Sequence, residues 1–87
     1  MNSRYTVTIN KSASKELENL PSIAIKRIFP KLENIADNPR PIGCVKLQGE
    51  NNLWRIRVGD YRIIYSIDDP NKIIDITRIR HRKEAYQ

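Results

Sequence analysis

The sequence predicts an α+β fold, in which two N-terminal helices pack on one face of an antiparallel β-sheet. The chain has 87 residues, which gives room for one core and one domain, residues 1–87. Helical periodicity is found in residues 13–36, and strand-like alternation dominates residues 45–80 after one early strand. Helices that come early and strands that come late are typical of this class.

The first third of the chain is predicted to form a strand and two helices. Residues 4–9 alternate with period two and direct Tyr5, Val7 and Ile9 inward. Helix-start residues at positions 10, 12 and 14 introduce a short helix at residues 13–20. A second helix is predicted at residues 23–36, with its apolar face formed by Ile25, Ile28, Phe29, Leu32, Ile35 and Ala36. Pro30 lies inside it, so we expect a kink or a break into two pieces.

The remainder is predicted to form the sheet. A turn-rich connection at residues 37–43 leads to a further strand at residues 45–48. Asp, Pro and Asn residues at positions 68–71 favour another turn. The last strand, residues 73–80, carries isoleucines at 73, 74, 76 and 79, which predicts burial on both faces.

A hairpin at residues 53–67 carries the most informative pattern. Gly59-Asp60 predicts a two-residue turn, since glycine adopts a positive φ at little cost. Such a turn places Arg57 directly opposite Arg62, with Arg55 on the same face. Trp54, Ile56, Val58, Tyr61, Ile63 and Tyr65 then point into the core. Like charges opposite each other are destabilising, so the three arginines predict an anion-binding face, and a phosphate backbone is the obvious anion.

Charge and composition limit the function classes. The formal net charge is +6, which suits nucleic acid, an acidic protein or an anionic membrane surface. A lone Cys44 excludes an internal disulfide, argues against a zinc site and fits a reducing cytosol. There is no apolar run of about 20 residues and no signal-peptide pattern, so we expect a cytoplasmic protein. No cofactor motif is present.

The C-terminal end is strongly basic. Residues 78–83 contain four arginine or lysine residues, which form either a solvated tail or a second part of the anion site. His81 is the only histidine, so a two-histidine ribonuclease mechanism is excluded. Any catalysis must use arginine, lysine, tyrosine or His81.

The string Leu53-Trp-Arg-Ile-Arg-Val-Gly-Asp-Tyr-Arg-Ile-Ile-Tyr65 resembles the RelE family, together with His81-Arg82 and Tyr86. These are toxins of type II toxin–antitoxin systems within the RelE/ParE superfamily. The resemblance covers nearly the whole chain and implies the RelE-like microbial ribonuclease fold. It implies a metal-independent, ribosome-dependent endoribonuclease that cleaves mRNA in the ribosomal A site by 2′-hydroxyl attack. The implied partners are a cognate antitoxin, the 30S A site and mRNA.

By this resemblance the catalytic residues are Arg55, Arg57, Arg62, Arg82 and Tyr86. His81, Arg80 and Lys46 are further candidates for catalysis or RNA binding. Well-studied members carry lysines where this chain has Arg55 and Arg57, and arginine is a poor base. The base is therefore His81, Tyr86 or a group of the ribosome. The assignment of Arg82 over Arg80 rests on the spacing to the last strand, which is defined to within one residue.

Two other functions compete with this interpretation. A ParE-like toxin with the same fold would inhibit DNA gyrase without nuclease activity, and such members typically lack the basic set. A non-catalytic RNA-binding module would use the arginines for phosphate contact alone.

Overall fold

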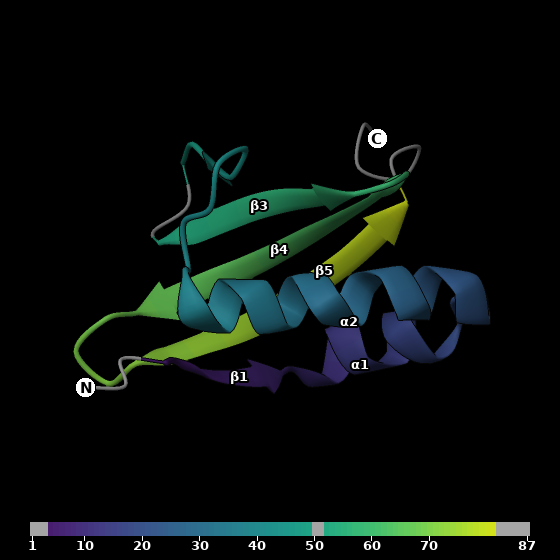
Figure 1. Ribbon diagram of the computed structural model, residues 1–87, viewed down its shortest axis with the longest axis horizontal. Helices are drawn as coiled ribbons and strands as arrows, with labels where there is room; N and C mark the ends of the chain where they lie inside the picture. The colour runs from purple at the N-terminus through teal and green to yellow at the C-terminus, as the bar shows by residue number, and fades with distance from the viewer. Residues whose placement is uncertain (1–3, 50–51, 82–87) are drawn as a thin grey trace.

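The computed structural model of the chain describes residues 4–49 and 52–81, which form a β-sheet and two helices (Figure 1). In chain order the elements are β1 (Thr6–Ile9), α1 (Lys11–Glu18), α2 (Ser22–Asp37), β2 (Val45–Lys46), β3 (Leu53–Val58), β4 (Tyr61–Asp68) and β5 (Ile73–His81). The strands form one sheet in the order β1-β5-β4-β3-β2. This architecture confirms the predicted α+β class.

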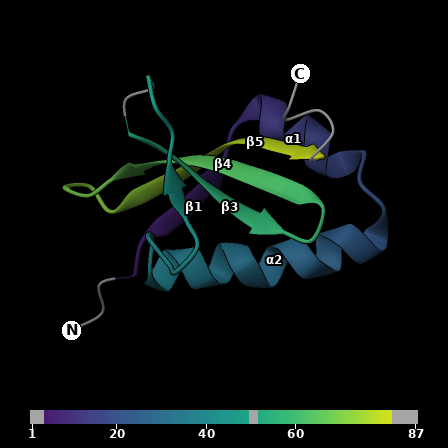
Figure 2. The ribbon, with the colours of Figure 1, turned by 90° about the horizontal axis from the view of Figure 1, so that it is seen from above.

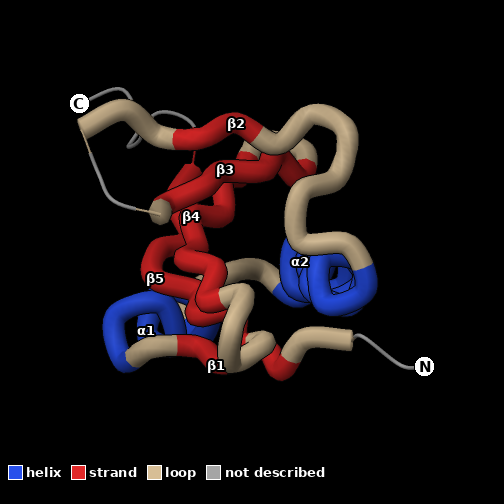
Figure 3. Tube along the Cα trace, turned by 90° about the vertical axis from the view of Figure 1, so that its left-hand side faces the viewer, coloured by secondary structure: helices blue, strands red, loops and turns tan. Residues whose placement is uncertain are grey.

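The sheet is mixed, because β1 runs parallel to β5 and the other neighbours are antiparallel. After β1 the two helices carry the chain to the far edge of the sheet, and the antiparallel strands then return to β1 (Figure 3). Alternation within residues 4–9 identified a strand correctly but contained no information on the direction of its neighbour. The prediction of an antiparallel sheet therefore holds for β2–β5 and needs correction at β1.

The two helices occupy different positions on the sheet. In Figure 2, α2 runs along the sheet while α1 lies beside β5. Helix α1 begins two residues earlier than predicted, because the Asn10 side chain accepts a hydrogen bond from the Ala13 N–H at 2.8 Å and caps the helix. Strand β2 has two residues, whereas four were predicted.

Helix α2 is continuous, so of the kink or break predicted at Pro30, the break is wrong. Proline leaves the carbonyl of Lys26 without its usual donor, but both residues are exposed and water can bond this carbonyl. Phe29 was predicted to be buried and is 45% exposed. Of the other predicted positions, Ile28, Leu32, Ile35 and Ala36 are buried.

The core lies between α2 and the sheet. Its largest fully buried side chains are Tyr65, Ile28, Ile35, Ile63, Ile67, Ile74, Ile76 and Ile79. Tyr65 was predicted to point inward and does so, with its hydroxyl donating to the Pro39 carbonyl at 2.7 Å. Burial raises the pKa of this hydroxyl.

Strand β5 is not buried on both faces, and this prediction was wrong. Its pairing with β4 shifts register between Ile64 and Tyr65, whose partners are Arg78 and Ile76, so Thr77 is the extra residue of a bulge. The bulge changes the phase of alternation and places Ile79 on the same side as Ile76. All three of the buried isoleucines of β5 therefore face the core, while Ile73 is 38% exposed.

Candidate anion-binding site

The β3–β4 turn determines the first part of the site. Gly59 has a φ of +60°, a conformation that glycine adopts readily. Val58 pairs with Tyr61 across the turn, and Arg57 consequently pairs with Arg62. The predicted hairpin register is confirmed.

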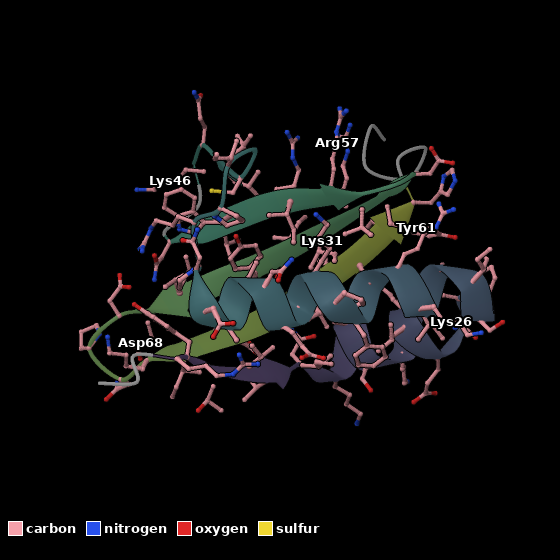
Figure 4. The ribbon with its side chains drawn as sticks, in the orientation of Figure 1. Lys26, Lys31, Lys46, Arg57, Tyr61 and Asp68 are labelled. Atoms are coloured by element: carbon pink, nitrogen blue, oxygen red, sulfur yellow. The ribbon has the colours of Figure 1, made fainter. Side chains whose placement is uncertain are left out.

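A third arginine extends this pair across the sheet. In the β4–β5 register Arg80 lies directly opposite Arg62, on the side away from Arg57. We call Arg57, Arg62 and Arg80 the arginine row. Neighbouring strands lie about 4.8 Å apart, so the backbones of the row span about 10 Å. Figure 4 shows Arg57 directed away from α2.

A second pair of arginines lies on the same face, two residues along β3 and β5 from the arginine row. Arg55 pairs with Ile64, and Ile64 pairs with Arg78. We call these two residues and the arginine row together the arginine face. Arg78 and Arg80 lie within the predicted last strand, residues 73–80, and β5 continues to His81. They were interpreted as part of a basic C-terminal end, although their alternation is the sequence signal that places both on one face of the sheet.

Burial differs strongly along the arginine row. Arg62 is 5% exposed, whereas Arg57 is exposed and the side chain of Arg80 is 37% exposed. A guanidinium stays protonated in proteins, so the row concentrates positive charge where water is partly excluded. It can bind a phosphate through paired N–H donors, but none of its members can serve as a base.

One acidic side chain reaches the row from α1. Glu16 forms an ion pair with Arg80, with Oε2 at 2.7 Å from Nε. Its Oε1 also accepts a hydrogen bond from the Ile79 N–H at 2.8 Å. No sequence pattern distinguished Glu16 from the other acidic residues of the helices.

Two of the predicted candidates lie away from the arginine face. His81 pairs with Tyr61 on the opposite side of the sheet, and the two rings meet edge to face at 5.3 Å. Lys46 pairs with Trp54, and its Nζ lies 6.0 Å from the centre of that ring. The structure therefore brings neither residue to the arginine row.

Arg82 and Tyr86 lie outside the described residues, and their predicted catalytic roles stay predictions.

Within residues 4–49 and 52–81, no cluster of three or more His, Cys, Asp or Glu side chains is arranged to hold a metal ion. In the same ranges, no helix has the length and apolar character needed to cross a membrane.

The chain is similar in sequence to toxins of type II toxin–antitoxin systems. The family model for the ParE toxin of type II toxin–antitoxin systems, parDE, matches residues 7–86. Toxin RelE of Mycobacterium tuberculosis is 31% identical over 87 residues, covering 95% of this chain and 87% of that protein. Toxin RelE3 of Methanocaldococcus jannaschii is 33% identical over 84 residues, covering 92% and 93%.

The structural comparison agrees. The toxin in the archaeal RelE–RelB complex from Pyrococcus horikoshii OT3 has a TM-score of 0.80 and 33% identity, covering 94% of this chain and 97% of that one. The match to the RelBE2 toxin–antitoxin complex from Mycobacterium tuberculosis has a TM-score of 0.80 at 26% identity, covering 91% and 92%. The chain therefore belongs to the ParE toxin family of type II toxin–antitoxin systems, and within it to the RelE-like toxins.

Proposed function

We propose that this toxin is a ribosome-dependent endoribonuclease that cleaves mRNA in the A site. The observation that carries the proposal is the arginine row, in which three guanidinium groups occupy adjacent strands in register. Such an arrangement costs stability in the free protein and becomes favourable when a phosphate lies between the charges.

The proposed reaction begins with attack of a 2′-hydroxyl on the adjacent phosphate. The P–O5′ bond breaks, giving a 2′,3′-cyclic phosphate on one fragment and a 5′-hydroxyl on the other. Negative charge accumulates on the phosphorane oxygens, and the row supplies fixed donors for it. The proton lost by the 2′-hydroxyl must pass to a base, and the leaving oxygen must gain a proton.

The roles follow from position. Arg57, Arg62 and Arg80 are proposed to hold the scissile phosphate, and Arg55 to hold the RNA beside it. Arg82 is proposed to assist the leaving group and Tyr86 to stack on a base, which are the roles that the resemblance to the RelE family implies. His81 faces the other side of the sheet, so Tyr86 or a ribosomal group is the better candidate for the base.

We propose that an antitoxin binds the arginine face. The related proteins from P. horikoshii and M. tuberculosis were solved as RelE–RelB and RelBE2 complexes. A net charge of +6 favours an acidic or amphipathic segment that folds as it covers the arginine face. Binding there would exclude RNA and keep the toxin inactive.

The proposal is tested by mapping cuts in a defined message on programmed ribosomes, with naked RNA beside it. We expect a cut within the A-site codon only when ribosomes are present. Arg80→Ala and Arg82→Ala should each be compared with wild type, because both arginines are proposed to act on the reacting phosphodiester and each variant should cleave more slowly. Lys26→Ala, an exposed change on α2, is the matched control. Absence of any cut by the folded wild-type protein would refute the nuclease function.

The match to a ParE toxin model also supports an activity on DNA gyrase as the second candidate. A supercoiling assay with the same preparations distinguishes the two. Inhibition of gyrase without RNA cleavage would establish the ParE-like function.

A further inference from the structure

We propose that Glu16 is a positioning residue, which holds Arg80 so that the terminal nitrogens of its guanidinium face the phosphate. This inference rests on the proposed nuclease function. Glu16 belongs to α1, an element that supplies none of the predicted catalytic groups.

A single carboxylate makes two contacts with consecutive residues of β5. Oε2 lies 2.7 Å from Nε of Arg80, and Oε1 accepts the Ile79 N–H at 2.8 Å. One contact fixes the strand backbone and the other fixes the side chain. The Glu16 side chain is only 24% exposed, so water competes less for the pair than at an open surface.

The position of Glu16 is itself well determined. Strand β1 covers β5 only as far as the Ile9–Ile76 pair. The next residue, Asn10, donates its backbone N–H to the Ile76 carbonyl at 2.9 Å and caps α1 with its side chain. Helix α1 therefore starts where β1 ends, and Ala13, fully buried, anchors it against the core. Glu16 then meets the edge of β5 that β1 no longer covers.

The atom that Glu16 contacts decides the chemistry. An ion pair at Nε occupies the inner edge of the guanidinium and leaves its two terminal nitrogens for an anion. Arg80 can thus bind Glu16 and a phosphate together. Without the carboxylate the long side chain would populate several rotamers, and ordering it in the transition state would cost free energy.

The experiment compares Glu16→Gln with Glu18→Gln in single-turnover cleavage on programmed ribosomes. Glutamine retains an oxygen for the Ile79 N–H but loses the charge that holds Arg80. Glu18 lies on the same helix, is exposed, and gives the same change in net charge. We expect Glu16→Gln to lower the cleavage rate about 10- to 100-fold with little change in the concentration for half-maximal rate. Glu18→Gln should stay within about twofold of wild type.

A double variant tests whether Glu16 acts through Arg80. In an Arg80→Ala background, Glu16→Gln should cause no further loss of rate, because the group it positions is gone. An equal loss in both backgrounds would overturn the proposal, as would wild-type rates for a folded Glu16→Gln protein. Either result would leave the nuclease function intact. A wild-type protein that cuts no RNA would refute both the nuclease function and the positioning role of Glu16.

Discussion

Arg62 is the one charged side chain that the fold buries among residues 4–49 and 52–81. Its pairing partners on both neighbouring strands are also arginines, Arg57 and Arg80. Burying a cation costs free energy, and like charges opposite each other add to this cost. This position agrees with the phosphate-binding role proposed for Arg62.

This burial leads to a prediction for Arg62→Ala. The variant should cleave mRNA on ribosomes at least about 100-fold more slowly, since one preorganised donor to the phosphorane is lost. The rate should be measured under single-turnover conditions, with circular dichroism and a thermal melt confirming the fold. Wild-type cleavage by a folded Arg62→Ala protein would contradict the arginine-row mechanism.

At the residue scale, the sequence predicted the Arg57–Arg62 pair correctly because a two-residue turn leaves one register. Arg82 was ranked above Arg80 by its spacing to the last strand, and the bulge at Thr77, which shifts the phase of that strand by one residue, was not predicted. Lys46 and His81 were selected by residue type, and alternation places both on the other face. Glu16 was not identified, because its contact joins elements 63 residues apart.

At the scale of elements, a polar cluster joins three segments at the end of the sheet opposite the β3–β4 turn. Asp69, between β4 and β5, accepts hydrogen bonds from Arg40 at 2.8 Å and from the Tyr5 hydroxyl at 2.5 Å. Arg40 lies in the connection from α2 to β2, and Tyr5 directly precedes β1. The bonds from Arg40 and then Tyr5 lower the pKa of Asp69 to about 2.

The cluster predicts a pH-dependent stability. The pKa of Asp69 is lower in the folded state, so its contribution is fully present above the ordinary value of 3.8 and is lost as pH falls toward 2. Asp69→Asn should therefore melt below wild type at pH 7, and the difference should shrink between pH 4 and 2. Thermal melts across pH 2–7 measure this, with Asp60→Asn in the β3–β4 turn as control. A difference that stays constant with pH would show that the carboxylate charge is unimportant.

Local patterns predicted most elements, and the errors arose where distant contacts decide the structure. The span of α2 was identified because its apolar spacing is regular across Pro30. The parallel placement of β1 depends on which strand becomes its neighbour, and the one-sided burial of β5 depends on the bulge at Thr77. Alternation alone encodes neither. Phe29 was assigned to the core because it has helical spacing, but the stripe that reaches the sheet is narrower.

At the scale of the whole molecule, the two faces of the sheet have separate tasks. Helix α2 covers one face and closes the core, while the opposite face presents Arg55, Arg57, Arg62, Arg78 and Arg80. The chain has a net charge of +6, so the arginine face accounts for much of the imbalance. Attraction to RNA should therefore be strong, concentrated on one face and sensitive to salt.

This separation of charge gives the last prediction. Each phosphate neutralised on a single strand contributes about −0.7 to the slope of log K against log salt, so one phosphate at the arginine row and one each at Arg55 and Arg78 would give about −2. Fluorescence anisotropy with a short single-stranded RNA at several salt concentrations measures the slope. Arg78→Ala should reduce its magnitude by about 0.7, whereas Lys26→Ala on α2 should leave it unchanged. If the two variants shift the slope equally, RNA binds the basic surface as a whole, and the arginine face is not the RNA-binding site.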